Sequence, residues 1–239
     1  WFGSRRSDKA GLGDWEVSKE IYPQGLSALA DHVRSLGMEF GLWFEPEMIN
    51  PDSDLYRKHP DWVLKVEGLP EIKSRNQFPL DLTKLEVRDY LFERIGALIR
   101  KLSIGYIKWD MNRDIQHPGD SDGHPIIHDQ TRALYSLIDR IRESFPNLVI
   151  ESCSSGGARA DYGILQRTGR IWPSDNNEAR TRSRIMRGAA FFLPLSCLGN
   201  HVGPESCHIT GRRLQMHFRA GAAVFGHMGM ELDLSKETE

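Results

Sequence analysis

The chain has 239 residues, of which 39% are hydrophobic and 27% charged, so it is long enough to bury a full core and typical of a globular domain. Its 31 basic and 33 acidic side chains leave a net charge of -2. That balance excludes the basic surface that nucleic acid or an anionic membrane would require, so we expect neither as a partner. No run of about 18 apolar residues occurs, which argues against a membrane-spanning helix.

The chain carries three cysteines, Cys153, Cys197 and Cys207. A sparse, odd set does not form a disulfide framework and favours a reducing compartment, so we expect a cytoplasmic location. The chain begins at Trp1 without a methionine. We therefore expect it to be a fragment of a larger multidomain protein.

Apolar spacing predicts strands and helices in alternation. In the first half of the chain we expect a helix over 24–36, a strand over 40–44, a strand over 78–81, a helix from a capping box at Thr83 and Glu86 to Leu102, and a strand over 105–110. In the second half we expect a helix over 128–145, strands over 148–153 and 171–175, a helix over 181–191, a strand over 195–198, a helix over 212–220 and a strand over 223–225.

This alternation implies βα units and a parallel sheet, hence an α/β fold. No glycine-rich phosphate loop follows the first strand, which argues against a dinucleotide-binding sheet. The repeat over this length fits a (β/α)8 TIM barrel, for which about 250 residues is typical. The patterns supply one strand fewer than eight. We therefore expect residues 1–239 to form a single catalytic barrel whose first strand lies just before Trp1 and is missing from this chain.

Catalytic groups of such barrels lie at the carboxyl ends of the strands. Reactive side chains follow nearly every expected strand: Trp43 and Glu45, Asp81, Asp110, Cys153, Asp175, His201 and His227. An Asp after a strand is often only the N-cap of the next helix, and Asp81 fits that alternative.

Asp110 follows a strand on which side chains alternate, so Lys108 shares its face. A cation there favours the ionised carboxylate, which can attack the anomeric carbon of a sugar. The alternative is a structural ion pair at the mouth of the barrel, extended by Arg113 and Asp114.

Asp175 follows Trp172 and Pro173, whose apolar cover favours the protonated carboxyl that a general acid needs. Two carboxyls in different surroundings are typical of glycoside hydrolysis, and retaining enzymes hold them about 5–5.5 Å apart. Trp43 and Trp172 stand at strand ends, where an indole can stack on a sugar ring. An isolated Trp would instead pack in the core.

Four blocks of sequence occur in an order that resembles glycoside hydrolase family 36 α-galactosidases. They are GLWFEPEM from Gly41, YIKWDMNR from Tyr106, ESCSSGG from Glu151 and WPSDN from Trp172. Trp1-Phe2-Gly3 and Gly13-Asp14-Trp15 are similar to the stretch after the first barrel strand of that family. The resemblance runs from residue 1 to about residue 230. Ser155 and Ala158 depart from it, because the family often has glycine there.

The resemblance implies a retaining α-galactosidase that acts on oligosaccharides such as melibiose and raffinose, without a cofactor or metal, and as a homo-oligomer at full length. Asp110 would be the nucleophile and Asp175 the general acid/base. The substrate-binding residues would be Trp43, Arg75, Lys108, Asn112, Cys153 and Trp172. The family also carries two aspartates that bind galactose just before the Trp-Phe pair, a position that precedes Trp1.

Three alternatives remain open. A galactosyl transferase of the raffinose-synthase kind would use the same two carboxylates and pass galactose to a sugar. A metal-dependent hydrolase would need His201, His208 and His227, but no His pair has metal-ligand spacing. The truncated chain could also be a non-catalytic sugar-binding fragment.

Overall fold

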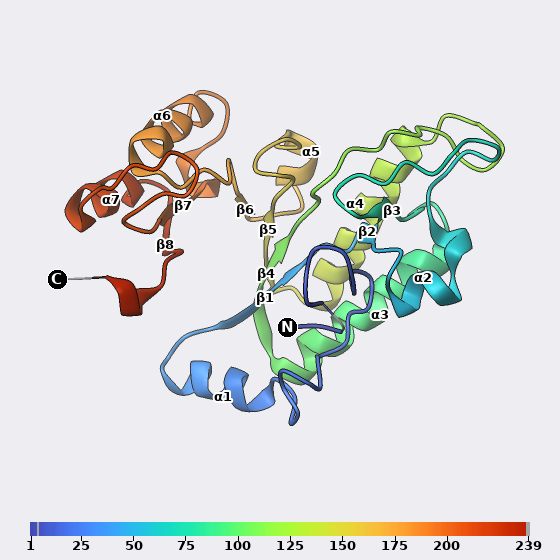
Figure 1. The fold of residues 1–239 in the computed structure, drawn as a ribbon, viewed down its shortest axis with the longest axis horizontal. Helices are drawn as coiled ribbons and strands as arrows, with labels where there is room; N and C mark the ends of the chain where they lie inside the picture. The colour runs from blue at the N-terminus through green and yellow to red at the C-terminus, as the bar shows by residue number, and fades with distance from the viewer. Residues whose placement is uncertain (4, 238–239) are drawn as a thin grey trace. The chain divides into compact units, whose positions relative to one another are not determined.

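The computed structural model describes residues 1–3 and 5–237, and the chain divides into two compact units, residues 1–150 and residues 151–239 (Figure 1). No helix within the described residues combines the length and the apolar character that crossing a membrane requires. Each unit contains parallel strands and helices, so the predicted α/β class is confirmed.

The first unit is built on two parallel strands, β1 (Phe40–Phe44) and β4 (Ile104–Trp109). Their register places Trp43 opposite Lys108 and Phe44 opposite Trp109. The strands approach closely at Gly41, where an added Cβ would lie 2.9 Å from the backbone oxygen of Tyr106. Both strands fall within a residue of the ranges that the sequence predicted.

The helices of this unit include α1 (Ser27–Ser35), α3 (Leu85–Leu102) and α4 (Ile127–Ser144). In Figure 1, α3 and α4 run alongside one another. The helical spacing buries Val87, Leu91, Ile95, Leu98 and Leu102 on α3, and Ala133, Leu134, Leu137, Ile138 and Ile141 on α4. Each large side chain buried in this way stabilises the fold by about 1.5–3 kcal/mol.

The loop between β1 and α3 contains elements that the sequence analysis did not predict. They are β2 (Met48–Ile49), α2 (Asp54–Lys58) and a short 3-10 helix (Pro60–Trp62). β3 (Phe78–Pro79) is shorter than predicted and pairs antiparallel with β2, so this strand is not the parallel strand that was expected. The predicted capping box is also wrong, because the hydroxyl of Thr83 bonds Asp81 and α3 begins with no side-chain cap.

The second unit contains two parallel pairs. β5 (Val149–Ser152) pairs with β6 (Arg170–Ile171), and β7 (Gly199–Val202) pairs with β8 (His227–Met230). Its helices are α5 (Tyr162–Leu165), α6 (Ala179–Ala189) and α7 (Met216–Ala223), with short 3-10 helices at Leu195–Cys197 and Leu234–Lys236.

The last two strands of this unit begin later than predicted. The apolar run 195–198 forms a 3-10 helix, and β7 follows it directly. Val224 and Phe225 follow the last residue of α7 and belong to no strand. Gly226, with a φ of +92°, then connects them to β8. A Cβ at Gly226 would lie 2.5 Å from the backbone oxygen of Leu198, so both the φ and the close approach require glycine.

Candidate active-site residues

Asp110 is a buried carboxylate with a donor on each oxygen. The indole Nε1 of Trp43 donates to Oδ2 at 3.0 Å, and the backbone N–H of Met111 donates to Oδ1 at 2.9 Å. The backbone N–H of Asp110 donates to the carbonyl of Phe44 at 2.8 Å, so the residue continues the pairing of β4 with β1. Only 7% of Asp110 is exposed, and charge-assisted hydrogen bonds of this kind offset the loss of water. The carboxylate is therefore held in one orientation.

The N-terminal aromatic residues fix Trp43. The ring of Phe2 stacks on that of Trp43 with centroids 6.2 Å apart and planes at 16°. The indole Nε1 of Trp1 donates to the carbonyl oxygen of Trp43 at 2.9 Å. Because Trp43 in turn donates to Asp110, these contacts connect the start of the chain to Asp110. The sequence analysis gave Trp1 and Phe2 no such role.

Glu45 lies just beyond β1 and is 1% exposed. Its Oε1 accepts from the backbone N–H of Asn112 at 2.7 Å, and its Oε2 accepts from Nε2 of Gln77 at 3.3 Å. Burial, and then the negative charge of Asp110, raise the pKa of Glu45 to about 7. The sequence placed Glu45 at a strand end but assigned it no function.

The structure brings three more of the predicted residues toward Asp110. Arg75 has a left-handed φ of +50° and donates from Nη1 to the carbonyl of Asn112 at 3.2 Å. Lys108 is half-buried on β4 opposite Trp43. Arg75, Lys108 and Asn112 therefore share one region of the first unit with Trp43 and Asp110.

Arg113 is buried and connects this region to the loop that carries Arg75. Its Nη1 donates to the carbonyls of Ile72 and Gln77, both at 2.9 Å, and its Nε donates to the carbonyl of Asp114 at 2.7 Å. Burial lowers the pKa of Arg113. Its hydrogen bonds thus go to backbone oxygens, whereas the sequence suggested a network of ion pairs.

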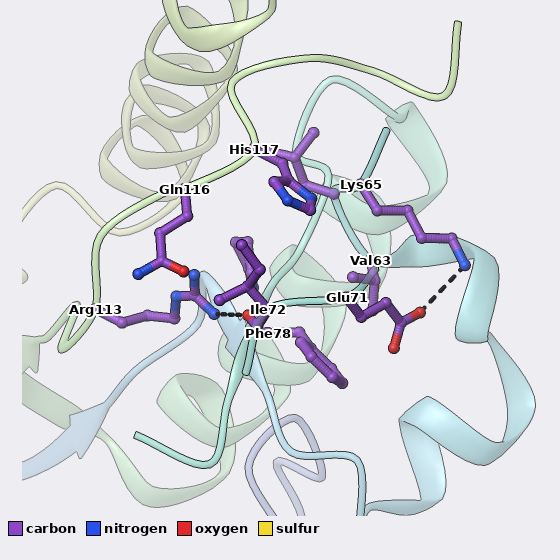
Figure 2. Close-up of a pocket in the computed structure, with 10 residues that line it drawn as sticks. Val63, Lys65, Glu71, Ile72, Phe78, Arg113, Gln116 and His117 are labelled. Carbon is purple, nitrogen blue, oxygen red and sulfur yellow. Dashed lines mark hydrogen bonds and ion pairs between the residues drawn. The ribbon is translucent and has the colours of Figure 1, made fainter. Parts of the chain in front are cut away.

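Figure 2 shows the guanidinium of Arg113 at one side of a small pocket, with its hydrogen bond to Ile72 drawn. The opposite side carries the ion pair of Lys65 and Glu71, whose charged atoms lie 3.2 Å apart. The pocket wall therefore includes the loop that Arg113 holds.

In the second unit, Asp175 is exposed and accepts from the indole Nε1 of Trp172 at 3.0 Å. Trp172 itself is 1% exposed. The sequence analysis expected its ring to cover the carboxyl, but the contact runs through the polar edge of the indole. The predicted apolar cover of Asp175 is therefore wrong for this unit.

Arg182 on α6 fixes the segment before Asp175. Its guanidinium carbon lies 4.1 Å from the ring centroid of Trp172, and it donates to the carbonyls of Ser174 at 2.5 Å and Gly199 at 2.6 Å. Burial lowers the pKa of Arg182 to about 10. The sequence gave no sign of this residue, since an Arg on an expected surface helix is usually solvated.

Cys153 is 2% exposed and follows β5 directly. The backbone N–H of Trp172 donates to the carbonyl of Ser152 at 2.9 Å, so Cys153 and Trp172 leave neighbouring strands. His201 lies against Trp172 with ring centroids 4.5 Å apart, and its Nδ1 is 3.2 Å from Oε2 of Glu231. His201 therefore packs on Trp172 and lies within hydrogen-bond distance of Glu231.

Comparison with known proteins shows the family of the chain. The sequence profile of the Melibiase family matches residues 1–239, and the chain belongs to that family. It is 48% identical over 233 residues to an α-galactosidase of Escherichia coli, covering 98% of this chain and 33% of that protein. The crystal structure of the glycoside hydrolase family 36 α-galactosidase AgaA from Geobacillus stearothermophilus superposes with a TM-score of 0.96 at 42% identity, covering 100% of this chain and 34% of AgaA.

AgaA variants have also been solved in complex with stachyose and with raffinose. The chain spans about a third of the length of these relatives.

Proposed function

We propose that the protein carrying this chain is a retaining α-galactosidase that hydrolyses terminal α-linked galactose from oligosaccharides such as melibiose and raffinose. Membership of the Melibiase family supports the reaction class. The complexes of AgaA with raffinose and stachyose support the class of substrate, since AgaA is 42% identical to this chain. The single observation that carries the proposal is the carboxylate of Asp110, held by donors on both oxygens at the end of β4.

In the first step, an oxygen of the Asp110 carboxylate attacks the anomeric carbon. The bond to the leaving oxygen breaks, and that oxygen takes the proton of Asp175. Trp43 donates to Oδ2, which leaves the other lone pairs of the carboxylate for the attack. The product is a galactosyl ester of Asp110.

In the second step, Asp175 accepts a proton from water, whose oxygen bonds to the anomeric carbon. The ester bond breaks and its electron pair returns to Asp110. Two inversions at one carbon retain the configuration. Asp175 is exposed, so water can reach it as the base of the second step, and the proton taken from that water restores the acid for the next cycle.

The remaining predicted residues would bind the sugar. Arg75, Lys108 and Asn112 offer hydrogen bonds to galactose hydroxyls, and Trp43 and Trp172 shape the pocket. Cys153 would contact the galactose from the end of β5. The parallel pairing of β1 with β4, of β5 with β6 and of β7 with β8 supports a single (β/α)8 barrel over residues 1–239. A homo-oligomer at full length and a cytoplasmic location remain predictions.

The test is hydrolysis of 4-nitrophenyl α-galactoside by the full-length protein, with the first-formed sugar followed by proton NMR. We expect α-galactose before mutarotation and no turnover in Asp110→Ala. First-formed β-galactose would mean direct attack by water and would overturn the double displacement. Transfer of galactose to sucrose without hydrolysis would move the assignment to a transferase.

A further inference from the structure

Glu45 and Asp110 leave neighbouring strands at the same end. Phe44 is opposite Trp109 in the register of β1 and β4, and each of the two acidic residues follows one of that pair. Both carboxyls are buried, Glu45 at 1% and Asp110 at 7% exposure. Two like charges in such a place destabilise one another, so one of the two carboxyls holds a proton over part of the pH range.

The proton belongs on Glu45. Asp110 already accepts one hydrogen bond on each oxygen, from an indole N–H and from a backbone N–H. The charged groups that face Glu45 are Asp110, which opposes its ionisation, and Arg75 and Arg5, which favour it. Burial outweighs the two cations, and the pKa of Glu45 is raised to about 7.

The hydrogen-bond partners of Glu45 suit either form. Asn112 donates its backbone N–H to Oε1 in both. Gln77 directs Nε2 toward Oε2, while its own Oε1 is buried without a partner among the described residues. Rotating that amide by half a turn breaks only the bond to Glu45 and offers an oxygen to a protonated carboxyl.

Glu45 also stabilises the turn from Asp110 to Asn112. Its bond to the N–H of Asn112 holds the segment from Asp110 to Asn112, and within that segment Met111 donates to Asp110. The orientation of the Asp110 carboxylate therefore depends on Glu45 through the backbone of this turn.

We propose that Glu45 is a positioning residue for Asp110 that must be protonated for the galactosyl-enzyme to break down at full rate. This inference rests on the proposed function. In that step, Asp110 regains its full negative charge as the ester bond breaks. A neutral Glu45 holds the turn without opposing that charge, whereas an ionised Glu45 places a second buried negative charge beside it. Formation of the ester, which removes charge from Asp110, is not opposed in this way.

The test uses the full-length protein, its isosteric variant Glu45→Gln and the matched control Glu47→Gln. Glu47 is also buried and acidic, but it accepts from the indole of Trp109 at 3.0 Å. The decay of the galactosyl-enzyme is measured after rapid mixing with an aryl α-galactoside. As the pH rises from about 6 to about 8, we expect decay of the galactosyl-enzyme to slow by about tenfold in the parent and in Glu47→Gln. A tenfold change in rate corresponds to about one pKa unit of interaction between Glu45 and Asp110. We expect little change in Glu45→Gln. A merely structural role would instead lower the rate of Glu45→Gln equally at every pH, and that result overturns the proposal.

A second measurement does not depend on activity. A carboxyl whose pKa is raised on folding binds its proton more tightly in the native state. Stability therefore falls as the pH rises from the pKa of the unfolded state to that of the folded state. From about pH 5 to about pH 8, the melting temperature of the parent should therefore fall relative to that of Glu45→Gln. If the two melting temperatures differ by the same amount at every pH, Glu45 holds no such proton and the inference is overturned. Absence of any galactosidase activity would overturn the proposed function instead, and the melting curves would still decide the protonation of Glu45.

Discussion

Trp43 donates its indole N–H to Oδ2 of Asp110 over 3.0 Å, and the two side chains come from adjacent parallel strands. In the second unit, Trp172 donates to Asp175 over the same distance. Each candidate catalytic carboxyl thus has an indole N–H as a partner, and in both cases the Trp lies on or directly after a strand. Tryptophan here orients carboxylates in addition to any contact with sugar.

Trp43→Phe tests the first of these contacts. Phenylalanine keeps an aromatic ring between Phe2 and the site but removes the donor to Asp110. Loss of a hydrogen bond to a charged group costs about 1.5–3 kcal/mol, so we expect kcat/KM to fall by about 10–100-fold. Steady-state kinetics on an aryl α-galactoside measures the change. Trp62→Phe is the control, because Trp62 stacks on His59. We expect this substitution to leave kcat/KM unchanged. Equal losses in both variants would contradict the role of the indole N–H.

Trp172→Phe separates the acid step from the rest of the reaction. Removing Nε1 takes away the hydrogen bond that the Asp175 carboxyl accepts from Trp172. Protonation matters most for a poor leaving group, so we expect kcat/KM for melibiose to fall about tenfold further than that for 4-nitrophenyl α-galactoside. Competition between the two substrates in one reaction measures the ratio directly. If both substrates lose activity equally, Trp172 acts on sugar binding and Asp175 is not oriented by it.

Arg113→Lys tests the connection between the loop that carries Arg75 and the segment from Asp110 to Asn112. A lysine keeps the charge but cannot reach the carbonyls of Ile72, Gln77 and Asp114 in the same planar arrangement. Leaving buried carbonyls unpaired costs about 1–3 kcal/mol each, so we expect a lower melting temperature.

The same substitution should also raise KM, because Arg75 depends on that loop to reach Asn112. Arg57→Lys is the control, since Arg57 forms exposed ion pairs with Asp52 and Asp54 that contribute little to stability. An unchanged KM in a destabilised Arg113→Lys would show that the loop holds Arg75 by other contacts.

The sequence predicted the elements whose pattern is local. Strands β1 and β4 and helices α3 and α4 appeared within a few residues of their expected positions, because each carries a continuous apolar run or face. The position of Asp110 directly after β4 was also predicted, because the apolar run before it marks where the buried strand ends. Later strands were misplaced where short apolar runs such as 195–198 fit a 3-10 helix as well as a strand.

The residues that the sequence did not reveal act through distant partners. Glu45 is defined by Asn112 and Gln77, and Arg182 by the carbonyls around Trp172. No spacing along the chain encodes such pairings, because they depend on which loops the fold brings together. The exposure of Asp175 was missed for the same reason: apolar neighbours in sequence do not fix which edge of an indole meets a carboxyl.

Two positions with positive φ give a matched test of backbone strain. Ser103 ends α3 with a φ of +49°, and Gly37 follows α1 with a φ of +77°. The left-handed conformation costs a residue with a Cβ about 1–2 kcal/mol, and replacing that residue with glycine removes this strain. Part of the resulting stabilisation is lost, because glycine has greater freedom in the unfolded chain. We therefore expect Ser103→Gly to stabilise the protein by about 0.5–1 kcal/mol. Gly37→Ala should destabilise it by a similar amount, although a Cβ there meets no atom within 4 Å. Urea denaturation of the two variants measures both, and changes of the same sign would contradict the strain argument.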